Sequence, residues 1–259
     1  MQHRLMGVGE ASALPMYMRH SQRAQEDVPE SGRRVPWYPL TWRGKALPLE
    51  PLLMVLLTFV GINAELWAGH KSYRRLYTED GRFEMGNLQD WQHSAMYAAF
   101  LLSGVVDLLG RGILKDTLPH GTEHGVLGSA FLAEGILFAF HLKGSSLDKS
   151  VHILLVLLVF AASLACFAEI GAAHGTVKQG LLPTARALLV MLQGIWFIQA
   201  AQILFTGNIA WDPNYHGSTM MVPVVFVTWL MIVLVVALVS FTVVSLAKMH
   251  RTSQGLTKP

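Results

Sequence analysis

Ionisable side chains occur inside two long apolar stretches of this chain. His93 and Asp107 stand in WQHSAMYAAFLLSGVVDLL, and Glu134 and His141 stand in GVLGSAFLAEGILFAFHL. Imidazole and carboxyl groups can transfer protons, and they can also bind transition metals. A charged side chain at the centre of a bilayer costs roughly 2.5–3.5 kcal/mol. Each of these four groups therefore needs a partner, a proton or a polar cavity.

The spacing of these residues places them at different depths of helices that would cross a membrane. His93 and Asp107 return to nearly the same helix face, but at 1.5 Å per residue they lie ~21 Å apart along the axis. Glu134 and His141 share a face with about 10 Å of rise between them. His93 and Asp107 therefore cannot bind one small ion together, and each needs a partner from another helix.

Antiparallel packing of consecutive helices predicts which groups meet. It places His93 and His141 at the non-cytoplasmic end of the bundle and Asp107 at the cytoplasmic end, with Glu134 between them. His152 starts the next apolar block and reaches the level of the two histidines. Glu65, near the end of the first block, either joins this group or reaches the membrane interface.

The three histidines raise the question of a metal site. We predict either no cofactor or zinc, or another transition metal, bound by His93, His141 and His152. HExxH and Cys/His metal signatures are absent from the sequence, and so are the P-loop and the dinucleotide fingerprint. Hydrogen bonding between helices is the alternative role for the same side chains.

The other polar groups give two further expectations. Glu169 lies near the cytoplasmic side with Asp107, where two neighbouring carboxylates could share a proton, or each could accept separate hydrogen bonds or reach water. Gln193 can hydrogen-bond across helices without ionising. The predicted lining of a polar cavity in the bundle is Glu65, His93, Asp107, Glu134, His141, His152, Glu169 and Gln193. Glycines expected to allow close helix approach are Gly104, Gly128, Gly135 and Gly194.

The elements that must position these groups are membrane-spanning helices. The chain has 259 residues, of which 52% are hydrophobic and 14% are charged, and its mean hydropathy is +0.40. Each apolar block is about as long as the ~20 residues that a helix needs to cross a bilayer. The sequence predicts an all-α, multi-pass transmembrane helical bundle that contacts the lipid bilayer. Its six predicted spans are 49–68, 92–110, 124–142, 151–171, 187–206 and 220–247.

The basic residues predict how the bundle is oriented. With six spans, the two tails and the second and fourth loops hold fourteen Lys and Arg residues, against six in the other loops. Both termini are therefore predicted to be cytoplasmic. We expect a polar, disordered cytoplasmic tail at 1–47, the bundle at 48–248 and a short cytoplasmic tail at 249–259. The basic residues form no nucleic-acid footprint, and the lone Cys166 allows no intramolecular disulfide.

Several stretches resemble one known family. Four segments are similar to segments of the transmembrane protein 45 family, which includes epididymal transmembrane relatives: DWQHSAMYAAFLLSGVVDLL, LAEGILFAFHLKGSSLDKSVHILL, MLQGIWFIQAAQILF and GINAELWAG. Their succession along the chain makes the resemblance specific. The resemblance covers approximately residues 43–250. It implies a seven-helix protein of endomembranes or the plasma membrane, with largely undefined activity and no catalytic residues to carry over. The family's first helix is expected to be missing or replaced within residues 1–47.

Three functional classes remain open from the sequence. The first is a membrane protein whose polar cavity serves transport, trafficking or scaffold binding. The second is an intramembrane metal-dependent enzyme with His93, His141 and His152 as ligands and Glu134 as the base. The third is a structural protein whose polar groups only specify helix packing. The sequence identifies no protein partner.

Overall fold

The computed structural model describes residues 41–42, 45–67, 75–114, 117–142, 144–171 and 177–256. The predictions of a disordered tail and of a missing or replaced first helix concern residues 1–47, which lie outside the described residues except for the last few. Those few form a short antiparallel hairpin of β1 (Thr41–Trp42) and β2 (Lys45–Ala46).

Six helices of the described chain are long and apolar enough to cross a membrane. The predicted all-α, multi-pass bundle is therefore confirmed. A single 3₁₀ turn, η1 (Ile209–Trp211), precedes the last of these helices. The six are α2 (Leu49–Trp67), α3 (Leu88–Arg111), α4 (Thr122–Phe140), α5 (Ser146–Ile170), α6 (Val177–Phe205) and α7 (His216–Leu256).

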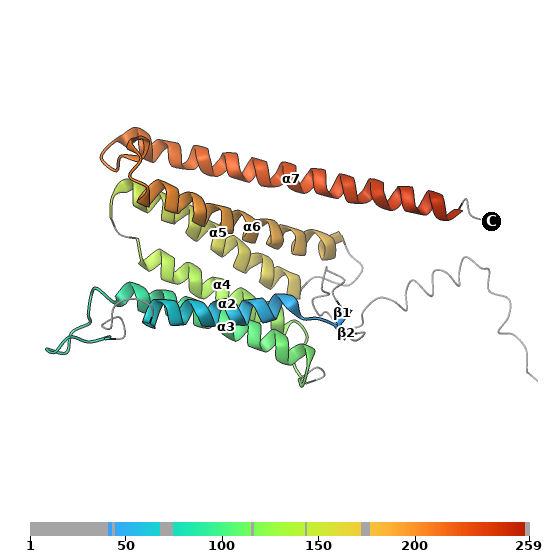
Figure 1. Ribbon diagram of the computed structural model, residues 1–259, viewed down its shortest axis with the longest axis horizontal. Coiled ribbons are helices and arrows are strands. Elements are labelled where there is room, and N and C mark those ends of the chain that lie inside the picture. The colour runs from blue at the N-terminus through green and yellow to red at the C-terminus, as the bar shows by residue number, and fades with distance from the viewer. Residues whose placement is uncertain are drawn as a thin grey trace, which may run out of the picture.

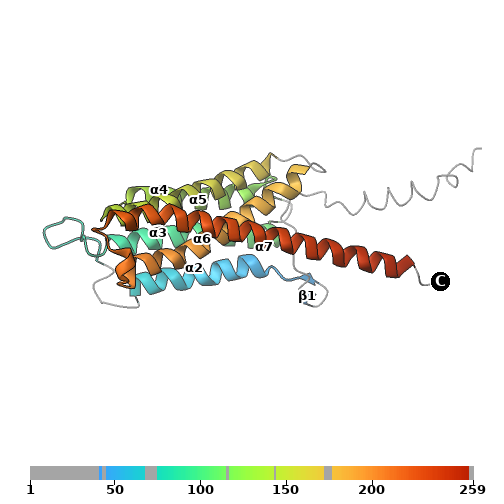
Figure 2. The ribbon, with the colours of Figure 1, turned by 90° about the horizontal axis from the view of Figure 1, so that it is seen from above.

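The helices pack mainly in the order of the sequence. Helix α2 packs on α3, α3 on α4, α4 on α5 and α5 on α6, while α7 packs on both α5 and α6. In Figure 1 the helices alternate in direction, and α7 and the α2/α3 pair lie on opposite sides of the bundle. The start of α2 and the end of α7 lie at the same end of the molecule in both Figures 1 and 2.

Helices α6 and α7 extend furthest beyond the predicted spans. Helix α6 begins at Val177 rather than near 187, and it contains Pro183. Helix α7 continues to Leu256, through most of the predicted short tail. The predicted limits followed hydropathy, but outside the hydrocarbon layer a helix continues through polar residues as long as its backbone hydrogen bonds form. In Figure 1, α7 runs past the ends of its neighbours.

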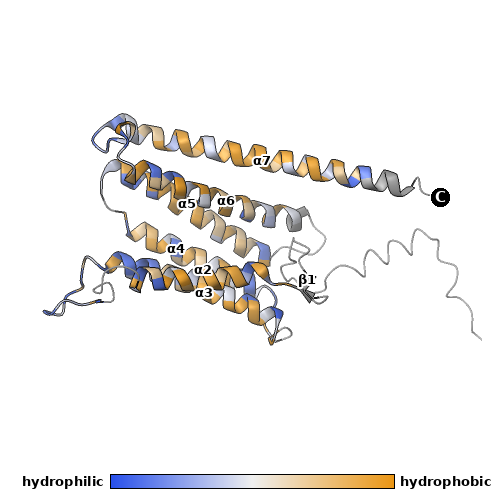
Figure 3. Cartoon of the chain, viewed as in Figure 1, coloured by the Kyte–Doolittle hydropathy of each residue, from blue (hydrophilic) through white to orange (hydrophobic). Residues whose placement is uncertain are grey.

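Helices α4 and α5 form the centre of the bundle. Within the most apolar window of each helix, 50% of α4 and 44% of α5 is buried, against 11% for α2 and for α7. Figure 3 shows hydrophobic residues along most of α7, up to the polar turns near its C-terminal end, as expected for a helix that faces lipid. The side chains of α4 are thus more enclosed by protein than those of the other helices. The buried core includes Leu127, Phe131, Phe138, Val151, Leu155, Val159, Cys166, Trp196 and Val222.

Glycines let α4 and its neighbours approach closely. A Cβ on Gly135 would lie 2.9 Å from the Phe160 ring of α5, and a Cβ on Gly128 would lie 3.1 Å from Phe167. Gly104 of α3 is similarly tight against α2. The fourth expectation was wrong, because a Cβ on Gly194 would meet no atom within 4 Å.

Candidate functional site

Three histidines come together at one end of the bundle. We call His93, His141 and His152 the histidine row. His93 lies near the start of α3, His141 caps the end of α4, and His152 lies in the second turn of α5. The ring centroids of His93 and His141 are 6.4 Å apart, and those of His141 and His152 are also 6.4 Å apart. His141 is therefore the middle member of the row.

Each imidazole of the row uses its Nδ1 atom in a polar contact. His93 Nδ1 lies 3.1 Å from Glu65 Oε1 of α2, and His141 Nδ1 lies 2.7 Å from Gln92 Oε1 of α3. These contacts fix the orientation of both rings. The side chains of His93 and Glu65 remain 29% and 25% exposed, so this level of the bundle is open to its surroundings.

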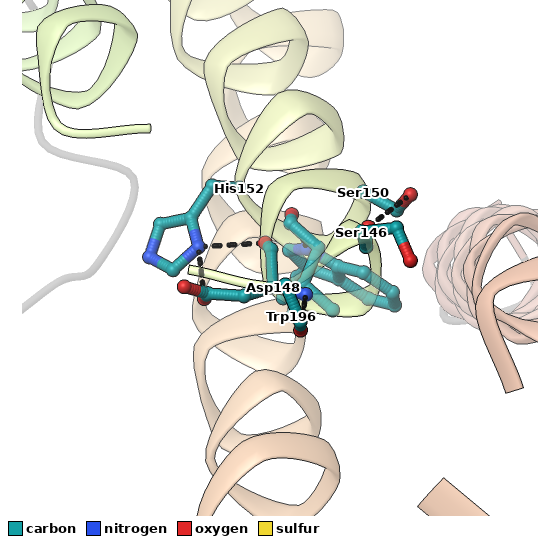
Figure 4. A network of polar contacts seen from close by, with 7 residues as sticks. Ser146, Asp148, Ser150, His152 and Trp196 are labelled. Carbon is teal, nitrogen blue, oxygen red and sulfur yellow. Dashed lines mark hydrogen bonds and ion pairs between the residues drawn. The ribbon is translucent and has the colours of Figure 1, made fainter. Parts of the chain in front are cut away.

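The third histidine is held by its own helix. His152 Nδ1 lies 2.9 Å from both the backbone oxygen and the Oδ1 atom of Asp148. The Asp148 N–H donates in turn to Ser145 Oγ, the N-cap of α5. Figure 4 shows the His152 ring on one side of this first part of α5 and the hydroxyls of Ser146 and Ser150 on the other. The segment SSLDKSVH thus both caps the start of α5 and orients the His152 ring.

The middle of the bundle holds a carboxyl group and an amide. Gln193 Nε2 of α6 donates to Glu134 Oε1 of α4 over 2.9 Å. Glu134 is 3% exposed and Gln193 is 7% exposed. Glu134 Oε2 and Gln193 Oε1 are both buried without a hydrogen-bond partner. This pair therefore carries two buried oxygen atoms that still lack a donor.

One phenol lies between the histidine level and the middle level. Tyr97 of α3 is within electrostatic reach of both Glu65 and Glu134. Its ring packs into the space left by Gly61 of α2, where an added Cβ would lie 3.0 Å from ring atoms. Tyr97 follows His93 by one helical turn, so α3 brings both polar groups to one face.

The opposite end of the bundle holds buried ion pairs. Glu169 Oε1 of α5 accepts from Arg186 Nε of α6 over 2.6 Å, and Glu169 Oε2 lies 3.0 Å from His124 Nε2 of α4. Asp107 of α3 accepts from Arg111 Nε over 2.7 Å. The carboxylate side chains of Glu169 and Asp107 are only 4% and 5% exposed. We call these five residues the charged cluster.

The predicted site residues thus separate into three levels, in the order that antiparallel packing predicted. Glu65 and the histidine row lie at one end, Glu134 with Gln193 lies in the middle, and Asp107 and Glu169 lie at the other end. Asp107 and Glu169 each accept from an arginine, so both carboxylates have the separate hydrogen bonds of the alternative, and a proton shared between them stays a prediction.

Sequence reasoning missed several partners of these groups. His124 and Arg186 fall at the edges of the predicted spans, where polar residues ordinarily reach water. Asp148 also lies in the first turn of α5, and Gln92 is the fifth residue of α3. The i, i+4 spacing of Asp148 with His152 and of Asp107 with Arg111 was an available signal for the two pairs within single helices.

The metal hypothesis gains no support from this geometry. In the described part of the chain, no three His, Cys, Asp or Glu side chains are arranged so that they could hold a metal ion. Metal binding by the histidine row stays a prediction. The contacts of its Nδ1 atoms resemble those that orient histidine ligands, but the same contacts also hold helices together.

Comparison with known proteins agrees with this architecture. Residues 120–242, from the start of α4 into α7, match the model of a "Family of unknown function (DUF716)". The chain is 33% identical over 149 residues to rat transmembrane epididymal protein 1, covering 56% of this chain and 47% of that protein. It is 31% identical over 150 residues to mouse transmembrane epididymal protein 1A, with the same two coverages.

The matched part of the chain spans about half the length of these curated relatives. Residues 120–242, which match the family model, include the middle pair and the part of the charged cluster that joins α4, α5 and α6. The resemblance predicted from the sequence is confirmed: this is a multi-pass membrane protein similar to the transmembrane epididymal proteins, and its residues 120–242 match a family of unknown function.

Proposed function

We propose that this protein is a transport protein that carries protons through the membrane along the axis of α4. The observation that carries the proposal is the order of side chains on this one helix. His124, Glu134 and His141 follow one another at intervals of about 15 Å and about 10 Å, at 1.5 Å per residue. Together they cover about 25 Å of a hydrocarbon core that is roughly 30 Å thick.

Each of the three levels has a group that can exchange a proton. The histidine row supplies imidazoles at the partly exposed end, and Glu134 supplies a carboxyl group in the middle. His124 beside Glu169 supplies an imidazole at the far end. Ionisable groups inside membrane spans commonly belong to proton relays, which supports this assignment.

The intervals between levels are longer than a hydrogen bond. Tyr97 lies between Glu65 and Glu134 and can shorten the first step, because a phenol both donates and accepts. Between Glu134 and His124, the described hydroxyl of Ser163 donates to the backbone oxygen of Gly128. Water molecules or a helix movement are needed to complete both steps.

Competing functions make different demands on Glu134. A protein that only packs its helices, or that serves trafficking or scaffold binding, needs a hydrogen-bonding group there but not an acid. Glutamine meets that demand, whereas a proton carrier requires the carboxyl group. The change Glu134→Gln therefore separates these functions with a minimal change in shape.

The test is a proton flux assay on the purified full-length chain in sealed liposomes. A pH-sensitive dye inside the vesicles reports proton entry when a membrane potential is imposed. We expect flux above that of empty vesicles, and we expect Glu134→Gln to remove it. The control Glu79→Gln makes the same change on an exposed turn and keeps the flux. Wild-type flux in a folded Glu134→Gln protein overturns the proposal.

The metal-dependent enzyme is tested on the same preparation. Elemental analysis of the purified protein measures zinc and other transition metals per chain. One equivalent of metal in the wild type, lost in His141→Ala, would favour the enzyme hypothesis over proton transport. We expect a metal content that is far below one equivalent and unchanged by this substitution.

We also propose that both termini face the cytoplasm, in an endomembrane or in the plasma membrane. Support comes from the excess of Lys and Arg in the tails and in the second and fourth loops. The start of α2 and the end of α7 lie at the same end of the bundle, which agrees with both tails sharing one side. The histidine row then faces the non-cytoplasmic side.

A further inference from the structure

The two oxygen atoms without partners in the middle pair belong to side chains that already bond each other. Four buried side-chain polar atoms of the described chain lack a hydrogen bond, and the other two are Trp91 Nε1 and Ser94 Oγ. Glu134 Oε2 and Gln193 Oε1 are the acceptor pair. A buried acceptor without a donor loses its hydrogen bond to water and gains none in the protein, so it is unfavourable. Two such oxygen atoms in one bonded pair indicate that a hydrogen-bond donor belongs between Glu134 Oε2 and Gln193 Oε1.

We infer that Glu134 and Gln193 form a binding site for one proton, held between Glu134 Oε2 and Gln193 Oε1. A carboxylic acid and a primary amide are both planar, and each offers one donor and one acceptor to the other. The observed bond from Gln193 Nε2 to Glu134 Oε1 is half of such a pair. The proton on Oε2 completes a ring with a second hydrogen bond.

The surroundings of the pair favour a proton over a charged ligand. Glu134 forms no ion pair with any described residue, in contrast to Glu169. Gln193, which comes from α6, is uncharged, and α3 contributes only the phenol of Tyr97 within electrostatic reach. From α5, no described side chain bonds to Glu134. An isolated buried carboxylate is strongly disfavoured, and a protonated acid avoids that charge.

A small metal cation is the other ligand that two oxygen atoms could attract. Hard cations such as Mg²⁺ or Ca²⁺ require six or more oxygen ligands, and this pair offers two that are unused. A proton requires only these two. Gln193 therefore acts as a positioning residue that selects the protonated acid, and the bond between α4 and α6 strengthens when the proton is bound.

This inference deepens the proposed function, because it names the proton-holding state of the carrier. Its test is independent of transport. Infrared spectroscopy of the purified full-length chain in lipid nanodiscs measures the carbonyl stretch of protonated carboxylic acids at neutral pH. We expect one band that Glu134→Gln removes and that shifts in heavy water.

The contribution of the amide is tested by Gln193→Met, which keeps the length of the side chain but removes both hydrogen-bonding atoms. The Glu134 band should then move to the higher frequency of an acid without an acceptor. If the Met variant folds poorly, Gln193→Asn is measured instead, because its shorter amide withdraws the acceptor from Glu134 Oε2 and should move the band in the same direction. The control Gln202→Leu changes an exposed amide on the same helix and leaves the band in place.

Three results would overturn the inference. One is no Glu134 band at neutral or mildly acidic pH, which would mean an ionised group. Another is a band that the Gln193 variants do not move. The third is a band that appears only when sodium is replaced by choline, which would identify a metal cation as the ligand. If the band is found but proton flux is not, the proton site stands and the transport proposal fails.

Discussion

Replacing Glu169 with Gln removes an acidic group that joins three helices. Its carboxylate on α5 accepts from Arg186 on α6 and lies 3.0 Å from His124 on α4. The side chains of His124 and Arg186 are 11% and 15% exposed, so water does little to screen the charge. Glutamine keeps the shape but leaves the arginine without its counter-charge, and it offers only one acceptor atom.

The expected loss of stability follows from these contacts. A charge-assisted hydrogen bond contributes about 1.5–3 kcal/mol, so the two contacts of Glu169 sum to roughly 3–6 kcal/mol. Breaking a buried ion pair by removing one partner costs about 3–5 kcal/mol in soluble proteins. In membranes the unfolded helices find other partners, and measured side-chain hydrogen bonds average nearer ~0.6 kcal/mol. We expect a loss of about 2–4 kcal/mol.

The measurement is the free energy of unfolding of the bundle in bicelles, determined by steric trapping. Asp80→Asn serves as the control, since Asp80 and Arg82 form an exposed pair with side chains 64% and 86% accessible. Exposed pairs contribute about 0–1 kcal/mol. If Glu169→Gln costs no more than Asp80→Asn, the idea that Glu169 holds three helices together is wrong.

Two further predictions use other parts of the bundle. Trp196→Phe should lower the free energy of unfolding by about 1–3 kcal/mol, because the buried indole donates to a backbone oxygen of α5 over 3.1 Å. Trp229→Phe changes a half-buried indole and should lower the free energy of unfolding less in the same assay. The buried Cys166 should not react with an impermeant maleimide in sealed, cytoplasmic-side-out vesicles. Thr117→Cys should be labelled in them directly and Asp80→Cys only after detergent lysis, whereas the reverse pattern would refute the proposed orientation.

Helical periodicity and antiparallel packing were enough to predict the three levels of polar groups. The rise per residue separates Asp107 from His93 along α3, whatever side chains surround them. Because consecutive helices run in opposite directions, the end of one helix lies beside the start of the next. That is why His141 and His152 could be placed near His93 without knowledge of any contact, whereas for Glu65 both the histidine group and the membrane interface remained open. The levels depend on backbone geometry alone, and backbone geometry is what hydropathy and length predict best.

The partners within each level could not be predicted in the same way. His124 is 8% exposed although it lies in the first turn of α4. At a helix end a histidine usually reaches water, but here the His124 ring contacts Glu169 of α5, which also binds Arg186 of α6. Arg186 similarly stands one residue before the predicted span, where a basic residue suggests a solvated interface. The burial of a residue at a helix end depends on how far the neighbouring helices extend, and the hydropathy of the sequence does not predict this.

The three levels stabilise their acidic groups by different means, and depth explains the difference. Near the end of the bundle Glu169 can pair with Arg186, because a guanidinium there is close to the interface and need not be carried to the centre of the membrane. At the level of Glu134 a second charged residue would have to be inserted far from water. A neutral amide with both a donor and an acceptor avoids that cost, but it leaves one acceptor on each partner unless a proton is present. The same depth that excludes an arginine from the middle of α4 thus favours an exchangeable proton there, and this makes the middle pair, rather than either charged end, the position where proton binding would control passage.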